Sequence, residues 1–339
     1  MLEYLEPLCR LTGASGDESR VAEYIRSVIS PYCRCEIDRM GNLTGFRQGR
    51  SRPNQLIMLD AHMDEVGLMI SSINEDGFLS FSTVGGVNVE SLLGARVRFG
   101  DVIGVIGLKP VHLAKGEERE TMPDRSALTV DIGAKDKADA QKHIHVGQIG
   151  TFESEYVLFG DGYLKARAID DRVGCAILID LILQEPDYDF CFSFSVQEEI
   201  GLRGARVAAY ALKPDRALCL EATTAADLAG MPENKTVCCL GQGAVVSFMD
   251  GATLYDSRMY QDALSLGKEN GIPVQSKRAV AGGNDAGSIH LTREGIPSFT
   301  ISVPCRYLHS PACVISLTDA VSVERLAAEM LRRMAEDEA

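Results

Sequence analysis

The hydrophobic positions of the chain alternate between short strand-like runs and longer stretches with helical spacing. Val21, Ile25, Val28 and Ile29 recur at helical spacing behind Ser15-Gly-Asp-Glu18, a capping-box pattern, and predict an amphipathic helix. The predicted strands cover 55–60, 163–169, 190–196, 216–220 and 298–303, and the further predicted helices cover 172–184, 204–211, 259–270 and 318–335. Strands that alternate with helices predict an α/β fold, with a mainly parallel sheet flanked by helices.

Residues 66–160 have a different pattern of hydrophobic residues and glycines. Short β-like pieces such as FLSFSTV and ALTVDIGA are separated there by glycines rather than by long amphipathic helices. This pattern predicts a small β-rich domain inserted into the α/β domain, which would then be discontinuous and formed by residues 1–65 and 161–339. The polar stretch 115–124 is expected to be a solvent-exposed loop.

Charge and composition restrict the partners and the compartment. The 34 basic and 48 acidic residues give a net charge of -14, which disfavours nucleic acid and anionic lipid as partners. No apolar run reaches the roughly 20 residues of a membrane span, and acids stand where a signal peptide would be basic. The 10 cysteines lack C-x-x-C spacing and several lie in apolar runs, as in a reducing compartment. We therefore expect a cytoplasmic protein.

Potential metal ligands occur at the carboxyl ends of the predicted strands. His62 and Asp64 follow the first strand, Asp170 and Asp171 the second, Glu198 and Glu199 the third, Glu221 the fourth and His309 the last. In open α/β sheets the carboxyl ends of strands line a common crevice, so these groups can converge. Two imidazoles with several carboxylates suit Zn²⁺, Co²⁺ or Mn²⁺. We expect two ions, bridged by Asp170, that hold a hydroxide and polarise a carbonyl.

Two further roles follow from neighbouring positions. Asp64 is two positions from His62, so in extended backbone its carboxylate shares a face with the imidazole and can orient it. Glu198 and Glu199 are adjacent and should point in different directions. One of them can therefore bind metal while the other acts as a general base.

Five motifs, in order along the chain, resemble a known family. AHMDEVG, ARAIDDR, QEEIGLRGA, GGNDAG and PCRYLHSP are similar to those of the glutamyl/deblocking, or tetrahedral, aminopeptidases of metallopeptidase family 42. The resemblance spans essentially the whole chain, including its KPVHL and VDIGA segments. It implies a zinc-exopeptidase-like fold with two zinc or cobalt ions, which releases N-terminal residues from short peptides. It also implies that residues 66–160 mediate dimerisation, often within twelve-subunit tetrahedral shells.

The resemblance also implies a role for each candidate residue. His62 and Glu199 would be terminal ligands, Asp170 the bridge, and His309 the terminal ligand of the second ion, which Glu221 would also hold. Glu198 would be the base that activates the metal-bound hydroxide, and Asp64 would orient His62.

Two positions depart from the family pattern. Glu221 stands where these aminopeptidases usually carry an aspartate, and Asn284 replaces a threonine. Because glutamate at the first position is typical of carboxypeptidase and deacylase relatives, a deacylase or carboxypeptidase-like metallohydrolase is the alternative function.

Two further functions are alternatives to the peptidase. Some members of the family are described as endoglucanases, but a chain without tryptophan and with 6% aromatic residues lacks the usual sugar platform. A catalytically silent metal-binding assembly protein is disfavoured because it would need neither Glu198 nor Asp64.

Several other polar residues favour a structural interpretation. His143 and His145 have no neighbouring carboxylates and are expected in a surface loop. Asp285 suits either a turn or helix cap or a place facing the cleft. Arg306 and Tyr307 either line the substrate pocket or pack beneath the metal site.

Overall fold

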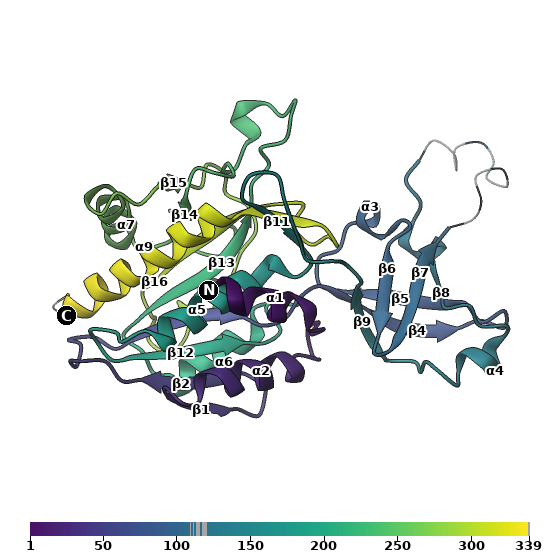
Figure 1. The fold of residues 1–339 in the computed structure, drawn as a ribbon, viewed down its shortest axis with the longest axis horizontal. Helices are drawn as coiled ribbons and strands as arrows, with labels where there is room; N and C mark the ends of the chain where they lie inside the picture. Colours follow the sequence, from purple (N-terminus) through teal and green to yellow (C-terminus); the bar gives the residue numbers. More distant parts are fainter. Residues whose placement is uncertain (109, 111, 113–115, 117–120, 338–339) are drawn as a thin grey trace.

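The computed structural model describes residues 1–108, 110, 112, 116 and 121–337, which form an α/β body with a β-barrel set to one side (Figure 1). The predicted α/β fold is confirmed. Half of the expected loop 115–124 and part of the KPVHL segment lie outside the described residues. No helix among the described residues is long and apolar enough to cross a membrane.

The body is built around one large sheet. The strand order is β1-β2-β12-β3-β13-β16-β17-β11-β10, and β14 pairs with β16 and β15. The strands are β1 (Arg34–Ile37), β2 (Leu43–Arg47), β3 (Ile57–His62), β10 (Val157–Phe159), β11 (Tyr163–Ala166), β12 (Phe190–Ser195), β13 (Arg216–Thr224), β14 (Ala244–Val246), β15 (Val274–Ser276), β16 (Ser298–Arg306) and β17 (Cys313–Ser316).

Only the centre of this sheet is parallel, so the expected mainly parallel sheet holds in part. Strands β12, β3, β13 and β16 run parallel to one another, whereas every pairing that involves β1, β2, β17, β11 or β10 is antiparallel. The reason lies in the connections, because short links such as the one between β16 and β17 can join only antiparallel strands. Every residue of β3 and β12 is buried, as expected for strands covered on both faces.

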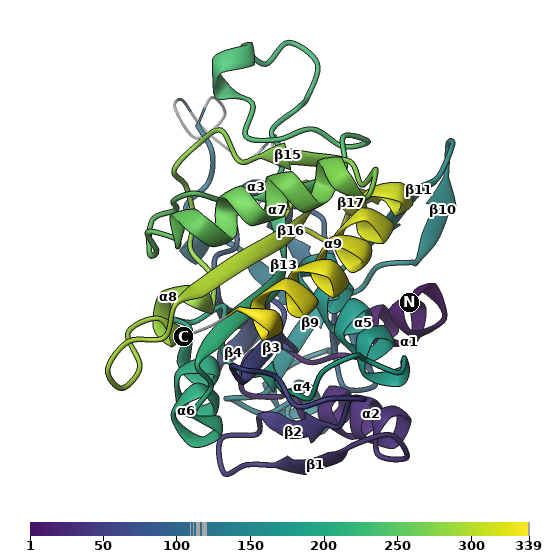
Figure 2. The same ribbon diagram turned by 90° about the vertical axis from the view of Figure 1, so that its left-hand side faces the viewer.

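Helices cover both faces of the sheet. They are α1 (Leu2–Arg10), α2 (Ser19–Ile29), α5 (Ile169–Leu183), α6 (Arg203–Leu212), α7 (Ser257–Glu269), α8 (Ala286–Ile289) and α9 (Leu317–Glu336). Helices α5 and α9 pack on one face, and α6 and α8 lie against the other (Figure 2). Because α1, α2 and α9 also contact α5, that helix is enclosed, and all of its residues except Asp180 and Leu183 are buried.

The barrel contains the strands β4 (Gly67–Ile73), β5 (Leu79–Val84), β6 (Arg96–Phe99), β7 (Val102–Gly107), β8 (Thr129–Asp131) and β9 (Ile149–Phe152). It has its own hydrophobic core, which includes Leu68, Val97, Phe99 and Val130. Close packing there requires glycine at position 150, where a Cβ would lie 2.4 Å from Phe99 Cδ1. Strand β10 pairs with β11 in the larger sheet, so sheet pairing places residues 157–159 with the body rather than with the insertion 66–160.

The N-terminal segment differs from its expected form. Helix α1 has no counterpart among the predicted elements, and the capping box at Ser15 is not formed, because the N-cap of α2 is Glu18 without a side-chain cap. Ser15 Oγ instead donates to Asp64 Oδ2 over 2.6 Å. Glu18 Oε1 accepts from the N–H groups of Gly16 and Gln197 at 2.8 and 3.1 Å. Tertiary partners have therefore replaced the local capping bonds.

Candidate metal centre

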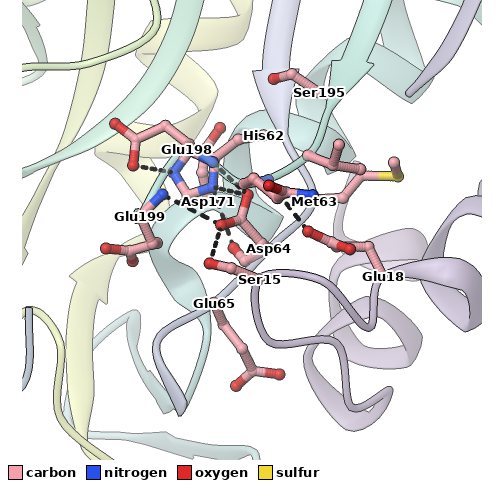
Figure 3. A network of polar contacts seen from close by, with 12 residues as sticks. Ser15, Glu18, His62, Met63, Asp64, Glu65, Asp171, Ser195, Glu198 and Glu199 are labelled. Carbon is pink, nitrogen blue, oxygen red and sulfur yellow. Dashed lines mark hydrogen bonds and ion pairs between the residues drawn. The ribbon is translucent and has the colours of Figure 1, made fainter. Parts of the chain in front are cut away.

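The predicted site residues meet near the carboxyl ends of the central strands. Figure 3 shows four of them, His62, Asp64, Glu198 and Glu199. His62 is the last residue of β3, Glu221 lies within β13, Asp170 and Asp171 open α5, Glu198 and Glu199 follow β12, and His309 lies between β16 and β17. Asp170 follows β11, which ends at Ala166. Because β11 pairs antiparallel with β17 and β17 pairs antiparallel with β16, β11 runs in the same direction as the central strands. Asp170 reaches the site from the first turn of α5.

Asp170 lies at the middle of the cluster. Its Oδ1 is 3.2 Å from His62 Nε2, and its Oδ2 is 3.3 Å from His309 Nε2. The two oxygens of one carboxylate thus face two different imidazoles.

The remaining carboxylates divide between the two imidazoles. Glu221 Oε2 is 3.7 Å from His62 Nε2, and Glu199 Oε2 is 3.3 Å from His309 Nε2. The expected grouping of Glu199 with His62 and of Glu221 with His309 is therefore wrong. The physical reason is the strand order, because β13 lies beside β3 and brings Glu221 next to His62.

Two groups of side chains could each hold a metal ion. One contains His62, Asp171 and Glu221, and the other Asp170, Glu199 and His309; within each group the candidate ligand atoms lie within 4.8 Å of one another. Asp171 is among the potential ligands at the strand ends, but neither its position nor the family resemblance assigns it a role. Glu199 Oε1 and Asp171 Oδ2 are buried without a hydrogen-bond partner. Such orphaned oxygens are rare in folded proteins, and a bound cation would satisfy them.

Asp64 is fully buried and connects His62 to the turn after β12. Its two carboxylate oxygens accept hydrogen bonds from the backbone N–H groups of Glu198 and Glu199 at 3.0 and 3.1 Å (Figure 3). Its Oδ1 is 3.5 Å from His62 Nδ1, and its backbone oxygen is nearer, at 3.1 Å. Asp64 therefore fixes both an imidazole and the backbone that carries the two glutamates. The sequence does not reveal the contact of Asp64 with Ser15, because the spacing of Ser15 and Glu18 predicts a helix cap instead.

Electrostatics in the cluster reflect many buried acids around two imidazoles. Burial raises the pKa of Glu198 and Glu221 well above the usual range, and burial with Asp170 raises that of Glu199 to about 8. Burial alone would lower the pKa of His309, but Asp170 and Glu199 raise it to about 10. Divalent cations would stabilise the ionised carboxylates and displace protons from both imidazoles. The donor set and its charge thus fit metal binding.

A cavity of about 340 Å³ opens beside the cluster. Glu198 lines it, with Oε2 4.0 Å from His62 Nε2. Away from the cluster its wall includes Thr223, Thr224, Val237, Lys277, Gly282 and Asn284. The carboxylate of Glu198 therefore lies between the candidate ligands and a space that could receive a substrate.

The other residues considered from sequence have mainly structural contacts. Asp285 is buried and accepts a hydrogen bond from Ser195 Oγ over 2.6 Å, so it does not line the cavity. Arg306 forms a two-pronged ion pair with Asp227, at 2.6 and 2.8 Å. His143 and His145 are exposed, as expected.

Comparison with known proteins identifies the relatives of the chain. A family model described as M42 glutamyl aminopeptidase matches residues 41–326. The lysyl aminopeptidase of Pyrococcus furiosus is 31% identical over 348 residues, which cover 98% of this chain and 97% of that protein.

Solved structures agree with this result. An aminopeptidase from the archaeon Desulfurococcus kamchatkensis is similar with a TM-score of 0.91 and 34% identity, covering 99% of this chain and 97% of the other. The Pyrococcus horikoshii TET1 peptidase is described as assembling into a tetrahedron or a large octahedral shell. Its TM-score is 0.86 and its identity is 30%, and the match covers 99% of both chains. A Thermotoga maritima protein described as an endoglucanase has a TM-score of 0.80 and 33% identity, and the match covers 98% of this chain and 96% of the other.

These matches extend over nearly all of the fold described above. They confirm the resemblance drawn from the five motifs, including the endoglucanase description of some relatives. The chain therefore belongs to the M42 glutamyl aminopeptidase family, and it is an aminopeptidase that cleaves peptides.

Proposed function

We propose that the chain is an aminopeptidase with two divalent metal ions. His62, Glu221 and Asp170 would hold one ion, with Asp171 next to them, and Asp170, Glu199 and His309 would hold the other. The observation that carries this proposal is the position of Asp170, whose two oxygens lie 3.2 and 3.3 Å from the two imidazoles. A carboxylate in that position can bridge two ions.

The donor set favours particular metals. Imidazole nitrogens with carboxylate oxygens suit Zn²⁺ or Co²⁺, with Mn²⁺ as an alternative. When bound, such ions polarise a carbonyl and lower the pKa of a water molecule.

Glu198 is the proposed general base. It lies at the cavity, and its neighbour Glu199 contacts His309 instead. Its carboxylate would take a proton from the attacking water and deliver it to the amine of the departing peptide. Asp64 would act as a positioning residue, because it holds the backbone of Glu198 and lies against His62.

We also propose a homo-oligomer in which the barrel contributes a dimer interface. The TET1 relative is described as assembling into a tetrahedron or a large octahedral shell. In the present chain the barrel stands apart from the body, and Ile103, Val105 and Leu108 are each about half exposed along and beyond β7. Exposed apolar residues that follow one another in this way are typical of a contact surface.

A peptide panel tests the proposed reaction against its alternative. Protein freed of metal would receive Zn²⁺, Co²⁺ or Mn²⁺ and then be assayed on matched peptides with free or acetylated N-termini. We expect hydrolysis only of the free-amino peptides, with two ions bound per chain in elemental analysis. Faster hydrolysis of the acetylated peptides would replace this proposal with the deacylase alternative that Glu221 suggests.

A further inference from the structure

The barrel reaches the candidate metal centre through one short loop. Residues 85–88 join β5 to α3 (Val89–Leu92), and Figure 1 shows α3 on the side of the barrel nearer the body. Val87 is buried in the core of the barrel, whereas Gly86 and Asn88 are exposed, and Asn88 lines the cavity beside the metal centre. The barrel therefore sets the position of a loop that lies against the site of the body.

This loop provides a backbone hydrogen bond for the imidazole of His309. His309 Nδ1 lies 2.9 Å from the backbone oxygen of Gly86. Because a carbonyl oxygen can only accept, Nδ1 is the donor, and Nε2 is the nitrogen left to bind an ion. His309 Nε2 faces Asp170 Oδ2 and Glu199 Oε2, each at 3.3 Å. A hydrogen bond of this kind fixes the orientation of a metal-binding imidazole.

The two imidazoles of the site are supported by different parts of the molecule. His62 ends a buried strand, is 1% exposed, and has its Nδ1 against Asp64 within the body. The side chain of His309 is 30% exposed, and the residue lies in the connection between β16 and β17 with a φ of +57°. Residues other than glycine adopt such a φ infrequently. His309 thus has less support from its own strand, and its Nδ1 hydrogen bond comes from the barrel.

Two adjacent glycines allow the loop to approach the candidate ligands closely. A Cβ at position 86 would lie 3.4 Å from His309 Nδ1. Gly85 has a φ of +83°, and a Cβ there would lie 3.2 Å from Glu199 Cβ and 3.0 Å from Val66 Cγ1. Glycine permits both this φ and this close approach of backbone. The loop therefore contacts His309 and Glu199, which belong to the same one of the two candidate ligand groups.

We propose that Gly85 and Gly86 are positioning residues for the ion next to His309, so that the inserted barrel determines how firmly this ion is held. The inference rests on the two-ion function proposed above. The other ion would depend on the barrel much less, because His62 and Glu221 belong to strands of the body. The barrel would thus have a role in the reaction that is separate from its proposed role in assembly.

Substitutions that add side-chain atoms to the loop test the proposal in the full-length enzyme. Gly86→Val places a branched side chain against the imidazole, and Gly86 is not among the residues with a positive φ, so valine does not strain its backbone. Gly85→Ala adds one carbon atom between Val66 and Glu199. Both variants should hold one ion with wild-type affinity and the other about 10 to 100 times more weakly. Zinc titration with elemental analysis measures the affinities, and anomalous scattering from zinc-loaded crystals should place the loss next to His309.

Gly94→Ala is the matched control. Gly94 also belongs to the insertion and has a φ of +71°, but no atom beyond its chain neighbours lies within 4 Å of the Cβ that alanine would add. The control therefore introduces a similar backbone strain without touching a candidate ligand, and it should hold both ions as the wild type does. Excess Zn²⁺ should restore peptide hydrolysis in Gly85→Ala and Gly86→Val, because the ligands and Glu198 are unchanged in both.

Two outcomes would overturn the inference while the two-ion function stands. The first is wild-type affinity for both ions in Gly85→Ala and Gly86→Val. The second is an equal loss of both ions, which would mean that the loop supports the fold as a whole. If the wild type binds fewer than two ions, the proposed function fails, and crystals of the metal-free proteins decide the inference. The His309 imidazole should then be displaced in Gly86→Val but not in Gly94→Ala, and an undisplaced imidazole in Gly86→Val would refute the positioning role.

Discussion

Asp64 Oδ1 accepts a hydrogen bond from the backbone N–H of Glu198 over 3.0 Å. This bond ties the segment after β3 to the turn after β12, although the two residues are separated by 134 positions in the chain. Because the same carboxylate also contacts His62 and the N–H of Glu199, one side chain fixes the position of three candidate site residues.

Asp64→Asn should therefore lower metal affinity or activity without unfolding the protein. The amide keeps the shape of the side chain, but it removes the charge next to His62 and can accept through only one oxygen. Loss of such a supporting residue typically lowers metal affinity or activity by about 10- to 100-fold. Metal titration and peptide hydrolysis would measure both. Ser15→Ala, which removes one donor to Asp64, should have a smaller effect, and an equal effect would contradict the central role of Asp64.

The two adjacent glutamates should differ when each is replaced. Glu198→Gln should retain both ions and lower turnover by roughly 10²- to 10⁴-fold, because it removes the general base. Glu199→Gln should instead lose metal, since Glu199 lies 3.3 Å from His309 and has an unpaired buried oxygen. Elemental analysis with single-turnover assays separates the two effects. Metal loss in the first variant and retention in the second would mean that the roles are reversed.

The sequence predicts which residues form the candidate site, but it does not predict which of them lie next to one another. His62, Asp170, Glu199, Glu221 and His309 stand out because ligand-type residues occur in ordered motifs, and the structure brings all five together. Which carboxylate meets which imidazole depends on the strand order, with β13 beside β3. Chain order does not contain that information.

The limits of the fold prediction have a similar cause. Central strands such as β12 were recognisable because they are continuous apolar runs. The edge strand β1 has four residues, none of them buried, and its neighbour β2 has only five, so neither is an apolar run long enough to be distinguished from a loop. Ser15 has an ordinary capping pattern, but a distant carboxylate competes for its hydroxyl, and this competition is visible only in three dimensions.

Glu65→Gln should destabilise the protein strongly. Glu65 is buried and pairs with Arg167 and Arg172, which are also buried. Removing its charge leaves two guanidinium groups without their counterion, and breaking a buried ion pair costs about 3–5 kcal/mol. Chemical denaturation would measure the change in the free energy of unfolding.

The matched control for this prediction is an exposed ion pair. Glu75→Gln removes the partner of Lys137, whose Nζ lies 2.8 Å away at the surface. Exposed pairs contribute only about 0–1 kcal/mol. If the two variants lose similar stability, the buried pair is not the structural element that we infer.

The barrel surface should govern assembly. Val105→Lys places a charge within the exposed apolar residues of β7, and light scattering should then show a smaller particle than the wild type. Leu291→Lys is the control, because Leu291 is also exposed but belongs to the body. An unchanged particle size in Val105→Lys, or dissociation in the control, would move the interface away from this strand.

The division of ligands between the two ions gives the sharpest test of the site. Because Glu221 lies near His62 whereas Glu199 lies near His309, single replacements should act on different ions. His309→Ala should empty the position next to Glu199, and Glu221→Ala the position next to His62; Asp170→Asn should weaken both. Glutamate is one methylene longer than aspartate, so Glu221→Asp should change occupancy only on the His62 side and shift the preference between free-amino and acetylated peptides. Anomalous scattering from metal-loaded crystals resolves the two positions. If His309→Ala and Glu221→Ala empty the same position, Glu221 and His309 share one ion, and the pairing inferred from the strand order is wrong.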